Sequence, residues 1–213
     1  MFAGKKSAQI REILISESAW EEMTCLFAPS LDFAGPYEVF TCATRVNRGD
    51  TPLFNVFTVG ESLSPVRARA GLKIDPDFTM DKHPVIDCLI VPGGVVSAEL
   101  VKQNVLEWIA KQALTTTIAA SVCTGAFLLA AAGVMEGKSA TTHWEDVTDL
   151  RAMFPWLSVK EGVRWVDEDE IVTSAGISAG IDMSLHLVER FKSRELALLT
   201  AKQLEFDWTE SQP

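Results

Sequence analysis

A regular alternation of short apolar runs with segments of helical periodicity constrains the fold of this chain more than any other feature. The apolar runs predict strands at residues 54–60, 85–94, 115–123, 163–166 and 171–174, and apolar residues at helical spacing predict helices at 97–114, 124–135, 180–191 and 194–206. Strands that alternate with helices form a mostly parallel sheet with helices on both faces. We therefore predict a single α/β domain over residues 1–213, a three-layer sandwich with a mostly parallel, flavodoxin-like sheet.

Charge and hydropathy narrow the class of partner. The net charge is −10 at pH 7 and no cluster of lysine or arginine is present, which argues against a nucleic-acid-binding face. No apolar run approaches the roughly 20 residues that a membrane-spanning helix needs. The first residues, MFAGKKSAQIREIL, lack the long apolar core of a secretory signal. We expect a small-molecule partner, with no nucleic acid and no membrane.

The four cysteines indicate a reducing compartment. Cys25, Cys42, Cys88 and Cys123 have the spacing of neither a zinc site nor a C-x-x-C redox pair. Unpaired cysteines are typical of cytosolic proteins, whose thiols are kept reduced. We therefore expect a cytoplasmic protein.

Cys123 stands where a predicted strand becomes a predicted helix. Ligands of parallel α/β sheets gather at the carboxyl ends of the strands, so a thiol at this position is a candidate nucleophile. The strand-to-helix turn resembles a nucleophile elbow, with cysteine in the place of serine. A helix N-terminus stabilises a thiolate, which predicts a lowered pKa for this thiol. The alternative is a buried, inert cysteine.

Other candidates also follow predicted strands. Gly93 and Gly94 could offer backbone N–H groups to an anion, or could form a simple turn. Asp32 precedes an apolar segment, where it could act as a helix cap. The small residues 174–180 form a second junction, which could be tight packing or the wall of a pocket. Of the three histidines, His143 is the one expected near the site, where an orienting or structural role is favoured over a direct catalytic one.

Five segments taken together resemble the ThiJ/PfpI superfamily, whose fold is that of the class I glutamine amidotransferases. They are LDFAGPYEVF (31–40), LIVPGG (89–94), SVCTGAFLLAAAGV (121–134), ATTHW (140–144) and TSAGISAGIDMSLHLVE (173–189). The resemblance implies that Cys123 is the nucleophile, that Gly93 and Gly94 supply amides beside it, and that Asp32 is the acidic partner of the thiol. It also implies a homodimer.

The residue after the cysteine separates branches of this superfamily. Protease-like and chaperone-like members carry histidine there, whereas this chain has Thr124. A Cys-Thr-Gly elbow with an aspartate partner resembles the isocyanide hydratases, which add water to an isocyanide to give an N-formamide without any cofactor. Thr124, Gly176 and Ile177 would then line the substrate pocket.

The resemblance leaves other functions open. Another cysteine-dependent activity, such as hydrolysis of a small amide or glyoxalase-like chemistry, is one alternative. A module that senses a ligand or oxidation is the other, because the same elbow occurs in the amidotransferase-like domains of AraC-type regulators.

The N-terminal part departs from the superfamily pattern, and we expect residues 1–30 to be irregular. Members begin with a short apolar strand before the LDFAGP segment. Here REILIS (11–16) as that strand would leave a long insertion, while MTCLFA (23–28) would leave a very short loop before Asp32.

Overall fold

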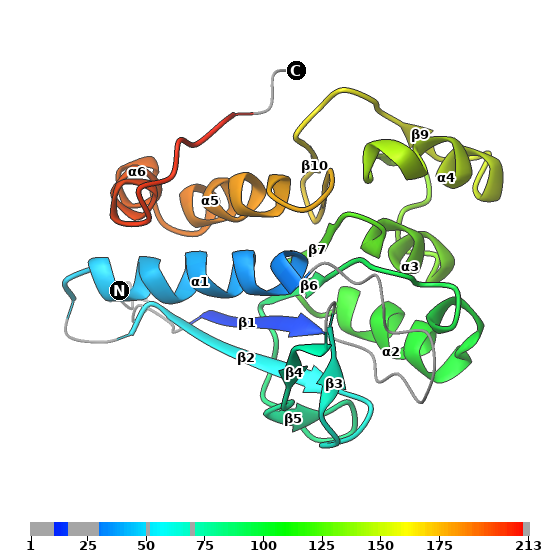
Figure 1. Ribbon diagram of the computed structural model, residues 1–213, viewed down its shortest axis with the longest axis horizontal. Coiled ribbons are helices and arrows are strands. Elements are labelled where there is room, and N and C mark those ends of the chain that lie inside the picture. Colours follow the sequence, from blue (N-terminus) through cyan, green and yellow to red (C-terminus); the bar gives the residue numbers. More distant parts are fainter. Residues whose placement is uncertain (1–10, 17–29, 50–51, 69–70, 211–213) are drawn as a thin grey trace, which may run out of the picture.

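A seven-stranded sheet forms the centre of the molecule, which we describe from a computed structural model over residues 11–16, 30–49, 52–68 and 71–210 (Figure 1). The strand order is β10-β11-β7-β6-β1-β2-β5, and every neighbouring pair is parallel except β10 and β11. The strands are β1 (Arg11–Ser16), β2 (Phe54–Gly60), β5 (Phe78–Thr79), β6 (Cys88–Val91), β7 (Ile118–Val122), β10 (Trp165–Glu168) and β11 (Ile171–Ser174). The predicted α/β fold with a mostly parallel sheet is confirmed, and the order of β2, β1, β6, β7 and β11 is the flavodoxin-like one.

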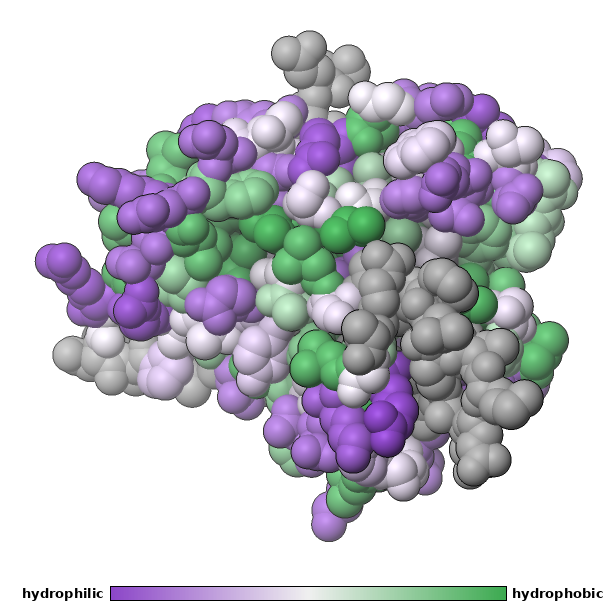
Figure 2. Space-filling view, in the orientation of Figure 1, coloured by the Kyte–Doolittle hydropathy of each residue, from purple (hydrophilic) through white to green (hydrophobic). Residues whose placement is uncertain are grey.

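Helices cover both faces of this sheet. One face carries α1 (Ser30–Val46), α5 (Ala179–Phe191) and α6 (Arg194–Gln203), and the other carries α2 (Gln103–Ala113) and α3 (Gly125–Ala131) with α4 (Val147–Met153) beside α3. Two short strand pairs, β3 (Val66–Arg67) with β4 (Lys73–Ile74) and β8 (Ser139–Ala140) with β9 (Ser158–Val159), and two 3₁₀ turns, η2 (Glu99–Val101) and η3 (Trp144–Asp146), complete the described elements. Figure 2 shows a band of apolar side chains across the left and middle of the viewed face, with hydrophilic side chains above it and in a patch below it.

The two central strands are apolar throughout because both of their faces are covered. Every residue of β6 and β7 is buried. In β6, Leu89 and Val91 belong to the core under α2, α3 and α4, while Cys88 and Ile90 belong to the core under α1, α5 and α6. Side chains of a strand alternate between faces, so a continuous apolar run is what a strand buried on both sides requires.

The first strand of the sheet is REILIS. These residues form β1, which pairs in parallel with both β2 and β6. The segment expected to be irregular, residues 1–30, therefore contains a regular strand. The competing interpretation, a strand at residues 23–28, lies outside the described residues.

Several predicted elements have different boundaries in the structure, and two of them differ most. The predicted strand 85–94 is limited to β6, and Val85 before it is 78% exposed. The predicted helix 97–114 is interrupted at Lys102, whose backbone is extended, so that η2 and α2 are separate. At this break the Lys102 ammonium lies 2.6 Å from a carboxylate oxygen of Glu61 and 3.2 Å from one of Glu99.

Candidate active site

The turn between β7 and α3 holds Cys123 in a left-handed backbone conformation, with φ of +56°. Such a conformation is uncommon for a residue other than glycine and persists where its surroundings enforce it. The Cys123 N–H donates to the carbonyl of Ser174 at 3.2 Å, and the Thr142 hydroxyl donates to the Cys123 carbonyl at 2.9 Å. These two bonds fix the backbone of the cysteine, and the predicted elbow is confirmed.

Gly125 explains how closely the elbow packs against the neighbouring strand. A Cβ on this residue would lie 2.1 Å from the carbonyl oxygen of Val91 in β6. No side chain fits there, because the obstructing atom belongs to the backbone of a central strand. Glycine therefore allows α3 to start directly beside β6 and sets the position of the sulfur.

Asp32 approaches Cys123 from α1, which covers the face of the sheet opposite to the one that α3 covers. It lies in the first turn of α1, inside the helix rather than at its cap, and is fully buried. Its carboxylate is close enough to the Cys123 thiol for its charge to raise the pKa of that thiol, while the backbone N–H of Thr124 lowers the same pKa. The structure thus brings together the two residues that the resemblance names as nucleophile and acidic partner.

The environment of Cys123 opposes a thiolate. Burial, first, and the negative charge of Asp32, second, raise the pKa of Cys123 well above its ordinary value, and the hydrogen bond from the Thr124 amide offsets this only in part. The prediction of a lowered pKa was wrong. The prediction relied on the dipole of the helix that follows the cysteine, which has only seven residues. That dipole is outweighed because the thiol is 95% buried and lies beside a carboxylate. The sulfur and Asp32 are therefore best treated as a pair that holds one proton.

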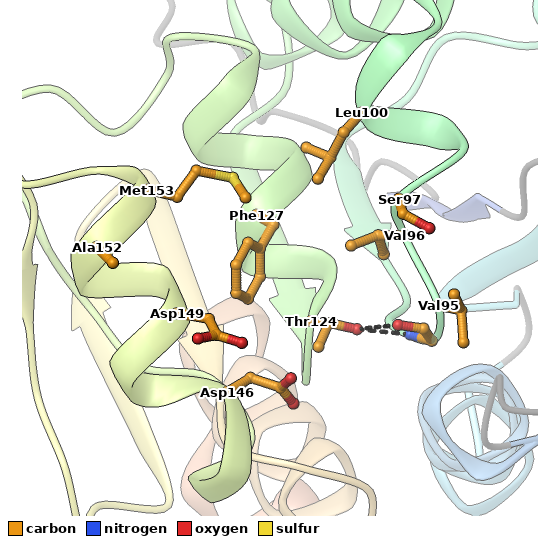
Figure 3. Close-up of a pocket in the computed structure, with 11 residues that line it drawn as sticks. Val95, Val96, Ser97, Leu100, Thr124, Phe127, Asp146, Asp149, Ala152 and Met153 are labelled. Carbon is orange, nitrogen blue, oxygen red and sulfur yellow. Dashed lines mark hydrogen bonds between the residues drawn. The ribbon is translucent and has the colours of Figure 1, made fainter.

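Gly93 and Gly94 lie against the elbow, beside Cys123, where the family resemblance puts them. A Cβ on Gly93 would come within 2.5 Å of the Thr124 nitrogen and 2.8 Å of the Cys123 Cβ. The Gly94 N–H donates to the Thr124 hydroxyl at 2.7 Å, and that hydroxyl donates to the Gly94 carbonyl at 2.7 Å. The Gly94 amide is thus engaged by Thr124, which locks the 93–94 turn onto the elbow (Figure 3).

His143, Gly176 and Ile177 form a second group beside the elbow. A Cβ on Gly176 would lie 1.9 Å from Cδ2 of the His143 ring, so the backbone of residue 176 rests on the imidazole. Ile177 has φ of +57°. All three residues line a cavity of about 330 Å³, whose lining does not include Cys123. His143 Nδ1 is 3.4 Å from a carboxylate oxygen of Asp146, so this histidine orients Asp146 rather than the thiol.

A larger cavity, of about 630 Å³, opens at Thr124 (Figure 3). Gly94 and Thr124 border it at the elbow, and its walls come from residues 95–100, from α3 and from the η3–α4 segment. The lining residues are Gly94, Val95, Val96, Ser97, Leu100, Thr124, Phe127, Asp146, Asp149, Ala152 and Met153. The sequence analysis did not select Asp146 and Asp149, although both lie within five residues after the segment ATTHW (140–144).

Two negative findings concern the part of the chain that the structure describes. Within it, no group of three or more His, Cys, Asp or Glu side chains is placed to hold a metal ion. Within the same ranges, no helix is long and apolar enough to cross a membrane.

Comparison with known proteins places this elbow in a family. Residues 29–190 match the DJ-1/PfpI family. The chain belongs to the DJ-1/PfpI family. It is 36% identical to an isonitrile hydratase of Pseudomonas putida over 177 residues, which are 83% of this chain and 73% of that protein. Isonitrile and isocyanide are two names for the same group, R–N≡C.

Regulators and solved structures of the DJ-1/PfpI family are similar as well. The chain is 33% identical to the transcriptional regulator GbdR of Pseudomonas aeruginosa over 142 residues, 67% of this chain but 38% of the regulator. A ThiJ/PfpI family protein from Pseudomonas syringae superposes with a TM-score of 0.79 at 26% identity, covering 93% of this chain and 76% of that one. Drosophila melanogaster DJ-1β shares the fold, with a TM-score of 0.77 at 20% identity over 94% of this chain and 100% of that one.

Proposed function

We propose that this protein is a cysteine-dependent hydro-lyase that adds water to an isocyanide and releases an N-formamide. The observation that carries the proposal is the pairing of Cys123 with the fully buried Asp32, whose charge acts on the thiol, at an elbow followed by threonine. The similarity to an isonitrile hydratase supports the same reaction. We further propose that the protein acts in the cytoplasm as a homodimer and needs no cofactor.

The first half of the reaction uses the single proton of the pair. Asp32 accepts the proton from the Cys123 thiol as the sulfur attacks the terminal carbon of R–N≡C. A carbon–sulfur bond forms and one carbon–nitrogen π bond breaks, with its electron pair passing to the nitrogen, so that the carbon keeps its own lone pair as an imidoyl anion. Asp32 then returns its proton to that carbon. The product is a thioimidate, R–N=CH–S, attached to Cys123, with Asp32 ionised again.

The second half consumes one water molecule. Asp32 takes a proton from water while the water oxygen attacks the thioimidate carbon. Asp32 then passes this proton to the nitrogen. The resulting intermediate, R–NH–CH(OH)–S, breaks its carbon–sulfur bond, and the hydroxyl proton leaves through Asp32 to the departing sulfur. The formamide R–NH–CHO is released and the thiol is restored, so atoms and charge balance.

The raised pKa of Cys123 fits this scheme. A pair with one proton avoids two adjacent negative charges in a buried site. The proton then moves from sulfur to Asp32 only as the sulfur gains its new bond to carbon. Thr124 contributes by holding the turn of Gly93 and Gly94 against the site through its two bonds to Gly94.

Formamide production from a panel of isocyanides tests the proposal. Cys123→Ala should abolish turnover, and Asp32→Asn, which keeps the shape but cannot carry the proton, should lower it by about 10²–10⁴-fold. Glu195→Gln on α6, an exposed carboxylate on the opposite face of the sheet from α3, serves as the matched control and should retain full activity. Near-normal turnover by Asp32→Asn would mean that Asp32 has only a structural role, and it would contradict the mechanism.

A sensing function is the second candidate, and the similarity to the regulator GbdR favours it. In that case a ligand would occupy the cavity at Thr124 without being converted. Binding of an isocyanide or a formamide that is released unchanged, with no formamide production under any condition, would support sensing over catalysis.

A further inference from the structure

We propose that the substrate carries a positively charged group on an apolar stem, with the stem in the cavity of about 630 Å³ and the charge beside Asp146 and Asp149. This inference rests on the proposed function, because it names the kind of isocyanide that the elbow would receive.

The apolar stem follows from the walls of the cavity. Val95, Val96 and Leu100 border it on one side, Met153 lies on the other, and the Phe127 ring on α3 forms the wall between them (Figure 3). Apolar walls with a few polar groups are the usual lining of a small-molecule site, and the volume falls in the ordinary range of about 300–1,000 Å³ for such sites. A purely ionic or strongly polar substrate would leave these walls unused.

The positive charge follows from the sign of the charged groups. Asp146 and Asp149 line the cavity, and no lysine or arginine is among the described residues that line it. In Figure 3 both carboxylates lie on the same side of the cavity, beside Thr124 and Phe127. A cavity with charges of one sign concentrates ligands of the opposite sign.

The carboxylates are close enough to affect one another and the sulfur. Burial, above all, together with the negative charges of Asp149 and Glu145, raises the pKa of Asp146, while His143 opposes this rise. The charge of Asp146 also raises the pKa of Cys123. A cationic group between Asp146 and Asp149 would relieve their repulsion, and an anionic group would add to it.

Three isocyanides that share one alkyl stem test the proposal directly. They end in an ammonium, a neutral methyl or a carboxylate group. We expect kcat/KM for the ammonium compound to exceed that for the carboxylate compound by at least tenfold at low salt, the lower end of the range for charge-lined clefts. The ratio should fall toward one in Asp149→Asn and at high salt, and stay unchanged in Glu195→Gln.

A second measurement does not depend on isocyanide turnover. Methanethiosulfonates that carry a trimethylammonium or a sulfonate group react with a thiol whatever the natural reaction is. The ratio of their rates at Cys123, followed by peptide mapping, should favour the cationic reagent in the wild type and should drop in Asp149→Asn but not in Glu195→Gln.

The two measurements separate the two claims. A cationic preference that Asp149→Asn removes, without turnover of any isocyanide, supports the charged-ligand proposal and counts against hydration. Turnover with equal rates for the three isocyanides, and an unchanged reagent ratio in Asp149→Asn, overturns the charged-substrate proposal and leaves hydration standing.

Discussion

Replacing Asp32 by asparagine should make Cys123 more reactive toward an alkylating agent while making the protein less active. The charge of Asp32 is, after burial, the largest cause of the raised pKa of Cys123. Asparagine keeps the size of the side chain but carries no charge, so it opposes the thiolate far less. Since the thiolate is the form that is alkylated, the rate at a fixed pH must rise.

The size of the effect can be worked from Coulomb's law. One unit charge about 4 Å away, at an effective dielectric constant of about 20, is worth about 4 kcal/mol. Every 1.36 kcal/mol is about tenfold in thiolate population, which sets an upper limit of about 10³-fold. Burial of the thiol remains in the variant, and the access of the reagent is unchanged. We expect Cys123 to react about 10²-fold faster at pH 7.

Iodoacetamide labelling between pH 6 and 10, followed by peptide mapping, measures this rate for Cys123 alone. Glu195→Gln removes one exposed negative charge elsewhere and should leave the profile where it is in the wild type. An Asp32→Asn profile that is unchanged, or that moves to higher pH, would refute the reasoning, because the carboxylate would then not be the group that opposes the thiolate.

Three further predictions concern the fold and the elbow. Gly125→Ala should lower the free energy of unfolding by about 3 kcal/mol or more in urea denaturation, because its Cβ would lie 2.1 Å from the Val91 carbonyl oxygen; a loss below about 1 kcal/mol would mean that the elbow can move. Burial raises the pKa of Asp167, but its bonds to a histidine and an arginine of α5 outweigh burial and leave it lowered. The stabilisation that these bonds give the folded protein is present above the unfolded pKa of about 3.9 and is lost as the pH falls through the lower folded pKa. Asp167→Asn should therefore lower the free energy of unfolding by about 1 kcal/mol at pH 7 and by almost nothing at pH 2. An equal loss at both pH values would contradict this. Thr124→Val should lower the free energy of unfolding by about 1–2 kcal/mol, because the Gly94 amide loses its hydroxyl partner. Thermal unfolding at the wild-type temperature would mean that this hydrogen bond does not stabilise the turn.

The sheet and the elbow could be predicted because their signals are local. The runs at 88–91 and 118–122 are apolar at every position, which is the pattern of strands buried on both faces. Cys123 follows the second run and precedes a helical pattern, so its place at the carboxyl edge of the sheet follows from the order of elements alone.

The parts that sequence reasoning missed depend on contacts between distant segments. The break at Lys102 lies where this residue pairs with Glu61, 41 positions away, a contact that the helical spacing of apolar residues cannot predict. The raised pKa of Cys123 comes from burial and from a carboxylate on α1, neither of which is visible in the elbow itself. The acidic wall of the cavity is likewise formed by η3 and α4, which pack beside α3 only in the folded chain.

The measurement that tests the central claim most directly is the mass of the protein after reaction with an isocyanide. In Asp32→Asn the attack can still use the thiolate, which is more populated in this variant, with a proton from solvent, whereas no group replaces Asp32 in activating water. The covalent intermediate should therefore accumulate. Intact-mass spectrometry should then show an increase equal to the mass of one isocyanide, and peptide mapping should place it on Cys123. The wild type should show formamide in solution and little adduct. Formamide production by Cys123→Ala, or an isocyanide-treated protein whose Cys123 stays unmodified while turnover continues, would contradict the account.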